Sequence, residues 1–303
     1  MLDQQDDGGQ GALNSSSTIE APIAPHELGH AVLTPSGAFE AGSWQTFKLV
    51  YTCGKYGMDD SASMRVCFRF ASDQSRPQFD DPKWRNYTTV VASNNAVLET
   101  RYDPKGNVRP WDRVLYIKVV KGFMKEGDTI TITFGETSGG SQGMRLQTFC
   151  EDTFEFRVLV DPIATANYQA LPEQPVIRIV PGKPVTFAAV VPTARCPGET
   201  FDLKIKGEDI WGNPSDQCDV TFKVKSSRPV NGLPDSVTLA PGSFAAIVEG
   251  LSVDGAGPVQ IWFEDDSGAE VFRANPLCIQ KDLDLKPYWV DLHGQSEETI
   301  GTG

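Results

Sequence analysis

Apolar and polar residues alternate with a period of two over most of this chain, and that pattern restricts its fold to β-strands. Phe47, Leu49, Tyr51 and Cys53 fall on one side of a predicted strand, with polar residues between them. The alternation recurs at 64–70, 114–120, 129–134, 154–160, 185–191, 201–209, 219–225, 244–253 and 259–265. The spacing of an amphipathic helix is sustained almost nowhere. The fold class is therefore mostly β, and successive one-faced strands predict β-sandwiches.

The length of 303 residues exceeds what one hydrophobic core usually serves, so we expect two folded domains. Prolines punctuate residues 170–184, and because proline discourages both helix and central strand, the boundary is placed near this segment. We expect a disordered acidic tail, two immunoglobulin-like β-sandwich domains, and the start of a further domain. The corresponding ranges are 1–20, 21–168, 169–284 and 285–303.

Charge and cysteine usage narrow the class of partner and the compartment. Lys and Arg number 27 against 40 Asp and Glu, and the net charge of -13 repels nucleic acid and anionic lipid. The sequence shows neither a bilayer-length apolar run nor a secretory signal pattern, which predicts a cytoplasmic protein without a membrane partner. The six cysteines lack close pairing and are expected to be reduced. Cys53 and Cys67 flank a predicted hairpin and are expected as buried thiols.

The segment His26-Glu27-Leu28-Gly29-His30 satisfies the HExxH zinc-protease pattern. That chemistry requires both histidines on one helix face, with the glutamate activating a metal-bound water. Pro25 and Pro35 leave room for only a short helix, and the chain has one further histidine, His293. An entry strand is the favoured interpretation, and a zinc metalloprotease is kept as an alternative.

Three loops are longer than hairpins require and carry arginine and tryptophan. They span 72–87, 101–113 and 135–147. Long loops on a rigid scaffold are often functional, and Arg and Trp suit anionic or aromatic ligands. The predicted contacts for a substrate are Arg76, Trp84, Arg109, Trp111 and Arg145. The glycine-rich run at 135–143 lacks the lysine of a phosphate-binding loop and is expected to be a flexible connection.

The last predicted strand brings metal-competent side chains to one face. Alternation places Asp291, His293 and Gln295 together, and Gly294 leaves room for a close approach. This pattern predicts a metal site that begins at the end of the chain.

Residues 287–296, PYWVDLHGQS, resemble the opening of the metal domain in the bacterial family called domain of unknown function 3604. The stretches 68–82, 101–111, 127–162 and 209–214 resemble the same family's N-terminal region. The resemblance implies a metal-dependent hydrolase similar to the polymerase-and-histidinol-phosphatase superfamily, with Zn, Mn or Fe bound in the complete protein. It makes His293 the first metal ligand, on the first strand of an α/β barrel that this chain does not contain. Gln295 departs from the superfamily's usual second histidine, which puts the metal count in doubt.

The resemblance implies a non-catalytic β-rich portion of a hydrolase, which would wall the active site, contribute substrate contacts and be inactive alone. Its partner would be a C-terminal metal domain, in the same chain or as a separate processed polypeptide. The alternative is a carbohydrate- or protein-binding β-sandwich module with no enzymatic role.

Overall fold

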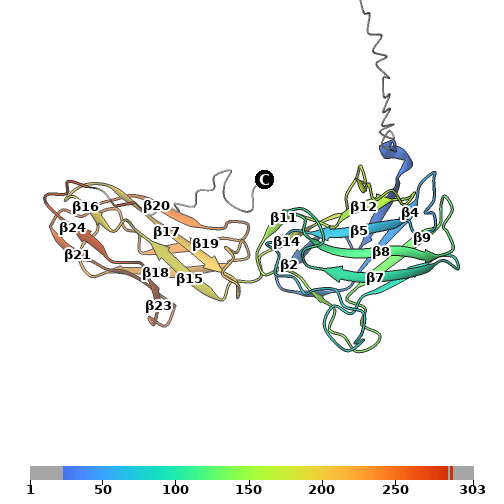
Figure 1. The fold of residues 1–303 in the computed structure, drawn as a ribbon. Helices are drawn as coiled ribbons and strands as arrows, with labels where there is room; N and C mark the ends of the chain where they lie inside the picture. Colours follow the sequence, from blue (N-terminus) through green and yellow to red (C-terminus); the bar gives the residue numbers. More distant parts are fainter. Residues whose placement is uncertain (1–22, 286, 289–303) are drawn as a thin grey trace, which may run out of the picture.

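The computed structural model describes residues 23–285, 287 and 288, which form two β-rich units joined by a short connection (Figure 1). The one helical element within these residues is the 3-10 helix η1 (Pro25–Glu27). The expectation of a mostly β chain is therefore confirmed. Across the same residues, no helix has the length and apolar character needed to cross a bilayer.

The first unit packs a four-stranded sheet against a five-stranded sheet, and neighbouring strands are antiparallel in both. The four-stranded sheet runs β1 (Gly29–Thr34), β4 (Phe47–Cys53), β9 (Thr129–Phe134) and β6 (Thr89–Ala92). The five-stranded sheet runs β13 (Gln169–Ala170), β12 (Arg157–Asp161), β5 (Ser63–Phe68), β8 (Arg113–Lys121) and β7 (Val97–Asp103). The strands predicted at 47–53, 64–70, 114–120 and 129–134 are β4, β5, β8 and β9, and are confirmed.

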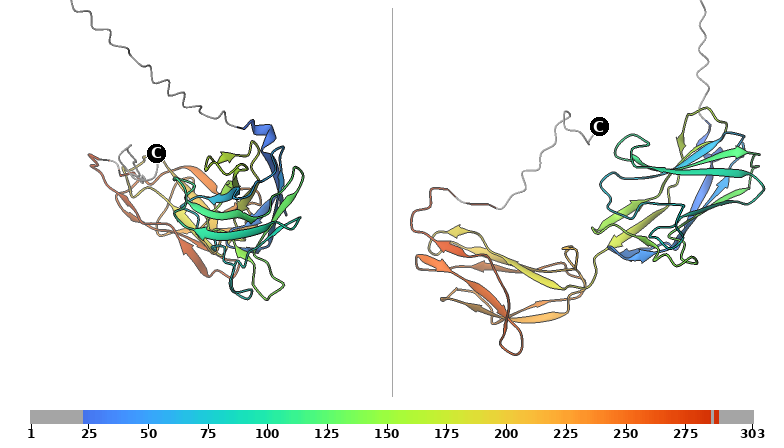
Figure 2. Two further views of the ribbon diagram at one scale, coloured as in Figure 1. Left: turned by 45° about the vertical axis from the view of Figure 1, so that its right-hand side comes forward. Right: turned by 60° about the horizontal axis from the view of Figure 1, so that its bottom comes forward.

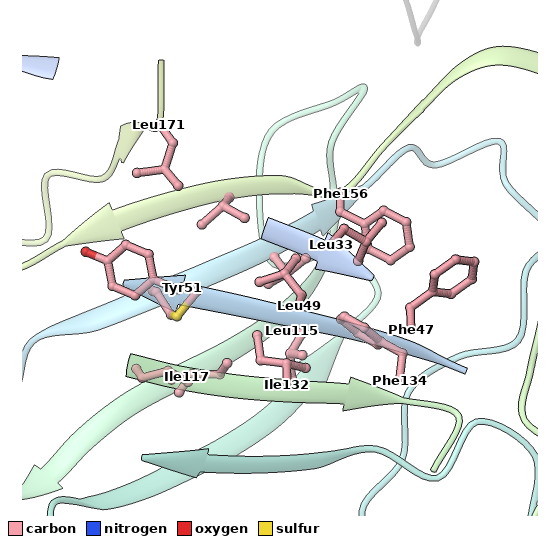
Figure 3. Close-up of a cluster of buried hydrophobic side chains, with 14 of the residues drawn as sticks. Leu33, Phe47, Leu49, Tyr51, Leu115, Ile117, Ile132, Phe134, Phe156 and Leu171 are labelled. Atoms are coloured by element: carbon pink, nitrogen blue, oxygen red, sulfur yellow. The ribbon is translucent and has the colours of Figure 1, made fainter. Parts of the chain in front are cut away.

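The core of this unit lies between the two sheets, where the inward side chains of both meet (Figure 3). Phe47, Leu49 and Tyr51 alternate along β4 and are fully buried, as the period of two requires. Leu115 and Ile117 approach them from β8. Each fully buried side chain of this size contributes roughly 2 kcal/mol through burial, so the alternation fixes which face of each strand points inward.

The two cysteines expected beside a hairpin lie in different sheets. Cys53 ends β4 in the four-stranded sheet, whereas Cys67 belongs to β5 in the five-stranded sheet. Consecutive strands cross between the layers here, because each must cover the same core from opposite sides. Both thiols are buried, and Cys67 packs on the outer face with Val114 and Leu159.

A three-stranded sheet closes one side of the first unit: β11 (Glu151–Glu155), β14 (Val176–Val180) and β2 (Ala38–Glu40). β14 lies in the segment expected to be the boundary, yet its Ile177 and Ile179 belong to the first core. Pro175 and Pro181 flank this central strand and do not interrupt it. The prediction took these prolines as signs of a linker, whereas they mark the two ends of a strand. The first unit therefore extends through Val180, beyond the boundary expected at residue 168.

The predicted strand at 154–160 is divided between two sheets. Its first residues belong to β11, and the chain passes into β12 at Arg157. Phe154 and Phe156 are both buried in the first core. Their rings stand 5.6 Å apart between centroids and lie nearly perpendicular, the favoured edge-to-face arrangement of aromatic side chains.

The second unit has its own core and three small sheets, drawn in yellow to red in Figures 1 and 2. One sheet runs β15 (Thr186–Val190), β17 (Phe201–Glu208) and β20 (Ala246–Leu251). Another runs β19 (Ser236–Leu239), β18 (Val220–Ser226), β22 (Ile261–Glu264) and β23 (Glu270–Arg273). The third runs β16 (Ala194–Arg195), β24 (Leu277–Ile279) and β21 (Gly257–Val259). The strands expected beyond residue 184 correspond to β15, β17, β18, β20 and β22.

Candidate functional site

Two of the three long loops of the first unit are hydrogen-bonded to each other. A two-stranded ribbon, β3 (Trp44–Gln45) with β10 (Met144–Arg145), supports them, and Trp44 pairs with Arg145 in register. The Ser75 amide donates to the Arg145 carbonyl at 3.0 Å, and the Arg145 amide donates to Ser75 Oγ at 2.9 Å. The loop at 72–87 is thereby fastened to the loop at 135–147.

The tip of the 72–87 loop is organised by one side-chain amide. Gln78 Oε1 accepts from the backbone amides of Asp80 and Asp81 at 3.1 and 3.0 Å. Gln78 Nε2 donates to the carbonyls of Asp81 and Trp84 at 2.8 and 3.4 Å. The backbone of Trp84 is therefore held in place, while its side chain remains 59% exposed.

The glycine-rich run forms a packed loop, contrary to the flexible connection expected from its composition. A Cβ at Gly139 would lie 2.5 Å from Pro82 Cβ, and one at Gly143 would lie 2.8 Å from the Gln45 carbonyl oxygen. Gly143 also has a φ of 109°, in the region that favours glycine. These glycines let the loop approach the 72–87 loop and the β3–β10 ribbon closely.

Two hollows have Trp84 and Arg85 in their linings. The first hollow has a volume of about 540 Å³ and is lined by Asp73, Gln74, Ser75, Arg76, Pro77, Gln78, Trp84, Arg85 and Arg145. The second has a volume of about 490 Å³ and is lined by Trp44, Lys83, Trp84, Arg85, Gly140 and Gln142. Three predicted contact residues, Arg76, Trp84 and Arg145, thus meet at the first hollow.

Arg145 is fixed by Asp73, which makes it the most firmly positioned cation of the site. Its guanidinium donates to the Asp73 carbonyl at 2.6 Å and to Asp73 Oδ2 at 3.4 Å. The Asp73 carboxylate also accepts from the Thr148 amide and hydroxyl at 2.8 and 2.9 Å. Burial acts to raise the pKa of Asp73, but these hydrogen bonds and the Arg145 charge outweigh it and lower the pKa.

Arg109 and Trp111 are not part of this site. Trp111 packs on the outer face of the five-stranded sheet, where the Arg157 guanidinium lies 5.1 Å from its ring centroid. The Arg109 guanidinium lies 5.0 Å from the Phe70 ring centroid, and its Nε lies 3.8 Å from Asp112 Oδ2. The 101–113 loop therefore covers a sheet, and residue type alone could not distinguish it from the other two loops.

Sequence reasoning missed several residues of the site. Arg85 follows Trp84 directly and could have been found by that adjacency. Trp44 belongs to a two-residue strand that no period could reveal, and Gln74 carries no recognisable motif. Asn86, which is buried, looked like an ordinary loop residue, although its side chain bonds to Ser75 in its own loop and its backbone amide bonds to Gly143 in the other.

The pentapeptide at 26–30 does not form a helix that could hold zinc. η1 ends at Glu27, and His30 lies in β1, where it pairs with Thr52. Glu27 forms an ion pair with Lys55, 2.5 Å from Nζ to Oε1. No group of three His, Cys, Asp or Glu suited to a metal occurs within residues 23–285. Asp291, His293 and Gln295 lie outside the described residues.

The turn at 209–214 connects the two units beside the first hollow. Trp211 Nε1 donates to the Ala41 carbonyl at 3.0 Å, and Asn213 Nδ2 donates to the Thr148 carbonyl at 2.9 Å. Within the turn, the Asp209 carboxylate accepts from the Asn213 side chain at 2.9 Å. The Arg145 guanidinium lies 5.9 Å from the Trp211 ring centroid, so the joint adjoins the site.

No protein-family model and no curated protein matches the sequence. Among solved structures, the Escherichia coli adhesin FdeC matches at 12% identity over 84% of this chain and 63% of that chain, with a TM-score of 0.33. The Yersinia pseudotuberculosis adhesin InvE matches at 11% over 82% of this chain and 58% of that chain, with a TM-score of 0.26. The S. aureus collagen adhesin matches at 11% over 84% and 94%, with a TM-score of 0.17.

This chain therefore spans less than two thirds of the FdeC and InvE chains. TM-scores this low do not establish a shared overall arrangement. The strands and loops of this chain define its class. It consists of two β-sandwich units, and loops of the first unit form a basic and aromatic site.

Proposed function

We propose that this chain is a carbohydrate-binding module built from two immunoglobulin-like β-sandwiches, and that the two hollows beside Trp84 are its ligand site. The observation that carries the proposal is Trp84, which is 59% exposed on a loop whose backbone is fixed by Gln78. An indole on a preorganised loop binds the apolar face of a sugar ring at little entropic cost. The amides and guanidinium groups around it supply partners for hydroxyl groups.

The site has room for a small-molecule ligand. Each hollow falls within the roughly 300–1,000 Å³ typical of ligand pockets. Trp44, 38% exposed, gives the second hollow its own indole. Two indoles in the lining of one hollow can each stack on a ring of an oligosaccharide.

The test is a binding screen of the chain against immobilised glycans, followed by calorimetry on those retained. Trp84→Ala should weaken binding by about thirtyfold or more, the loss expected at a central aromatic contact. Phe123→Ala is the matched control, because Phe123 is 58% exposed and lines neither hollow. A screen in which the chain retains no glycan, or binding unchanged by Trp84→Ala, would refute the proposal. If the chain retains a peptide in a parallel peptide screen and no glycan, the protein-binding alternative is favoured.

A second candidate is the accessory portion of a metal-dependent hydrolase, and the resemblance of residues 287–296 favours it. In that case the two units would wall a C-terminal metal domain and deliver substrate to it, in a cytoplasmic protein. The experiment is elemental analysis of the protein encoded by the complete gene. Zn, Mn or Fe bound in stoichiometric amount and lost in His293→Ala supports this candidate; a complete protein without such a metal excludes it.

A further inference from the structure

The charges around the two hollows are opposite in sign to the charge of the whole chain. Arg76, Lys83, Arg85 and Arg145 line them, and Asp73 is the only acidic side chain among the lining residues. The chain as a whole has a net charge of -13. A cationic patch on an anionic protein marks the place where an anionic ligand is favoured over other parts of the surface.

Three of these cations are not neutralised by a carboxylate, and one of them, the Arg85 guanidinium, lies 5.7 Å from the Trp84 ring centroid. Arg145 is compensated by Asp73, as described above. Arg76, Lys83 and Arg85 form no ion pair within the described part of the chain. Asp80 and Asp81 belong to the same loop but line neither hollow. The charge that remains at the hollows is therefore positive.

One residue that lines the first hollow carries a buried acceptor without a donor. Gln74 is 6% exposed and lines the hollow, and its Oε1 has no hydrogen-bond partner among the residues described. A buried polar atom without a partner is unfavourable, and a ligand hydroxyl that reached it after a movement of the Gln74 side chain would supply the missing donor. The hollow thus favours a ligand that carries both hydroxyl and anionic groups.

The two hollows share Trp84 and Arg85, so a ligand longer than one unit can occupy both. The indole of Trp84 then lies under the ring at the centre. Arg76 lines only the first hollow and Lys83 only the second, whereas Arg85 lines both. This order of aromatic and cationic groups matches a chain of sugars that carries an anionic group on successive rings.

We propose that the ligand is an acidic oligosaccharide, with carboxylate or sulfate groups, that spans both hollows across Trp84. The inference rests on the proposed carbohydrate-binding function and adds the class of glycan. Guanidinium groups pair with carboxylate and sulfate oxygens in the same bidentate manner. The proposal therefore covers both kinds of anionic group, and the experiment distinguishes them.

The experiment is calorimetric titration of the chain with three oligosaccharides of matched length: neutral, uronate-bearing and sulfated. At least one acidic oligosaccharide should bind about tenfold or more tightly than the neutral one, with affinity that falls as salt rises. Arg76→Gln and Arg85→Gln should each remove most of that preference, measured as the ratio of the affinities for the acidic and the neutral oligosaccharide. Lys225→Gln, on β18 of the second unit, is the charge-matched control.

The possible results separate the two proposals. If neutral and acidic oligosaccharides bind equally well and neither arginine variant has an effect, this inference is overturned and the carbohydrate-binding function still stands. No binding of any of the three would overturn both. Preference for only the uronate or only the sulfated arm supports the inference and identifies the anionic group.

Discussion

The side-chain amide of Asn86 donates to the carbonyl of Ser75 at 2.6 Å, and this bond joins the two ends of the 72–87 loop. Asn86 is fully buried and has a φ of 51°, which asparagine tolerates better than most residues. Its backbone amide donates to the Gly143 carbonyl at 2.7 Å. One residue thus connects both loops of the candidate site.

Replacement of Asn86 by alanine should lower the free energy of unfolding by about 2–3 kcal/mol and weaken ligand binding. The substitution leaves the Ser75 carbonyl without its donor. It also puts alanine at a positive φ, a backbone conformation that alanine adopts less readily than asparagine. Chemical denaturation measures the loss. Asn86→Gly isolates the hydrogen bond, because glycine accepts the backbone conformation; a glycine variant as stable as the wild type would contradict the role assigned to the side chain.

Gly139→Ala should reduce ligand binding more than it reduces stability. The added methyl group would press on Pro82, two residues before Trp84, and shift the loop that presents the indole. We expect a loss of affinity of about tenfold, with a change in unfolding free energy near 1 kcal/mol. Ser138→Ala, at the neighbouring position, is the control. Equal affinity for Gly139→Ala and wild type would show that Pro82 does not position Trp84.

The joint between the units should weaken in acid because of Asp209. Burial acts to raise the pKa of this carboxyl, but hydrogen bonds from Asn213, Gly182 and Trp211 outweigh it and hold the pKa below the ordinary value of 3.8. A lowered pKa in the folded state gives stability that is complete above the unfolded value and is lost as pH falls through the folded value.

We therefore expect the unfolding free energy to fall below about pH 4, and Asp209→Asn to reduce that slope. Denaturation followed between pH 2 and pH 6 measures it. Asp265→Asn is a suitable comparison, since Asp265 also has a lowered pKa but lies in a β-turn remote from the joint. Identical pH profiles for wild type and Asp209→Asn would contradict the assignment.

Thiol reactivity should follow burial. Burial raises the pKa of Cys53 and of Cys67 to about 12, so neither forms a thiolate near neutral pH. Cys150 is exposed. At pH 8, brief treatment with iodoacetamide followed by peptide mass mapping should find label on Cys150 and none on Cys53 or Cys67. The denatured protein, in which all cysteines react, is the control, and label on Cys53 in the native protein would contradict the packing described.

The strands could be predicted wherever one face is buried, since β4 and β9 alternate strictly between core and exterior. β14 was missed because its flanking prolines, Pro175 and Pro181, mark the ends of a strand as readily as a linker. The site was predicted only in part. Residue type selected Trp84 and Trp111 equally, and only the packing of Trp111 on the outer face of a sheet separates them.

The hydrogen bonds of Trp211 and Asn213 to the first unit can transmit force between the units in addition to the covalent chain. If the units are pulled apart, force passes along the chain at 181–184 and also through these side chains to Ala41 and Thr148. Both acceptors lie close in sequence to Trp44 and Arg145. A mechanical load on the second unit would therefore also act on the rim of the ligand site.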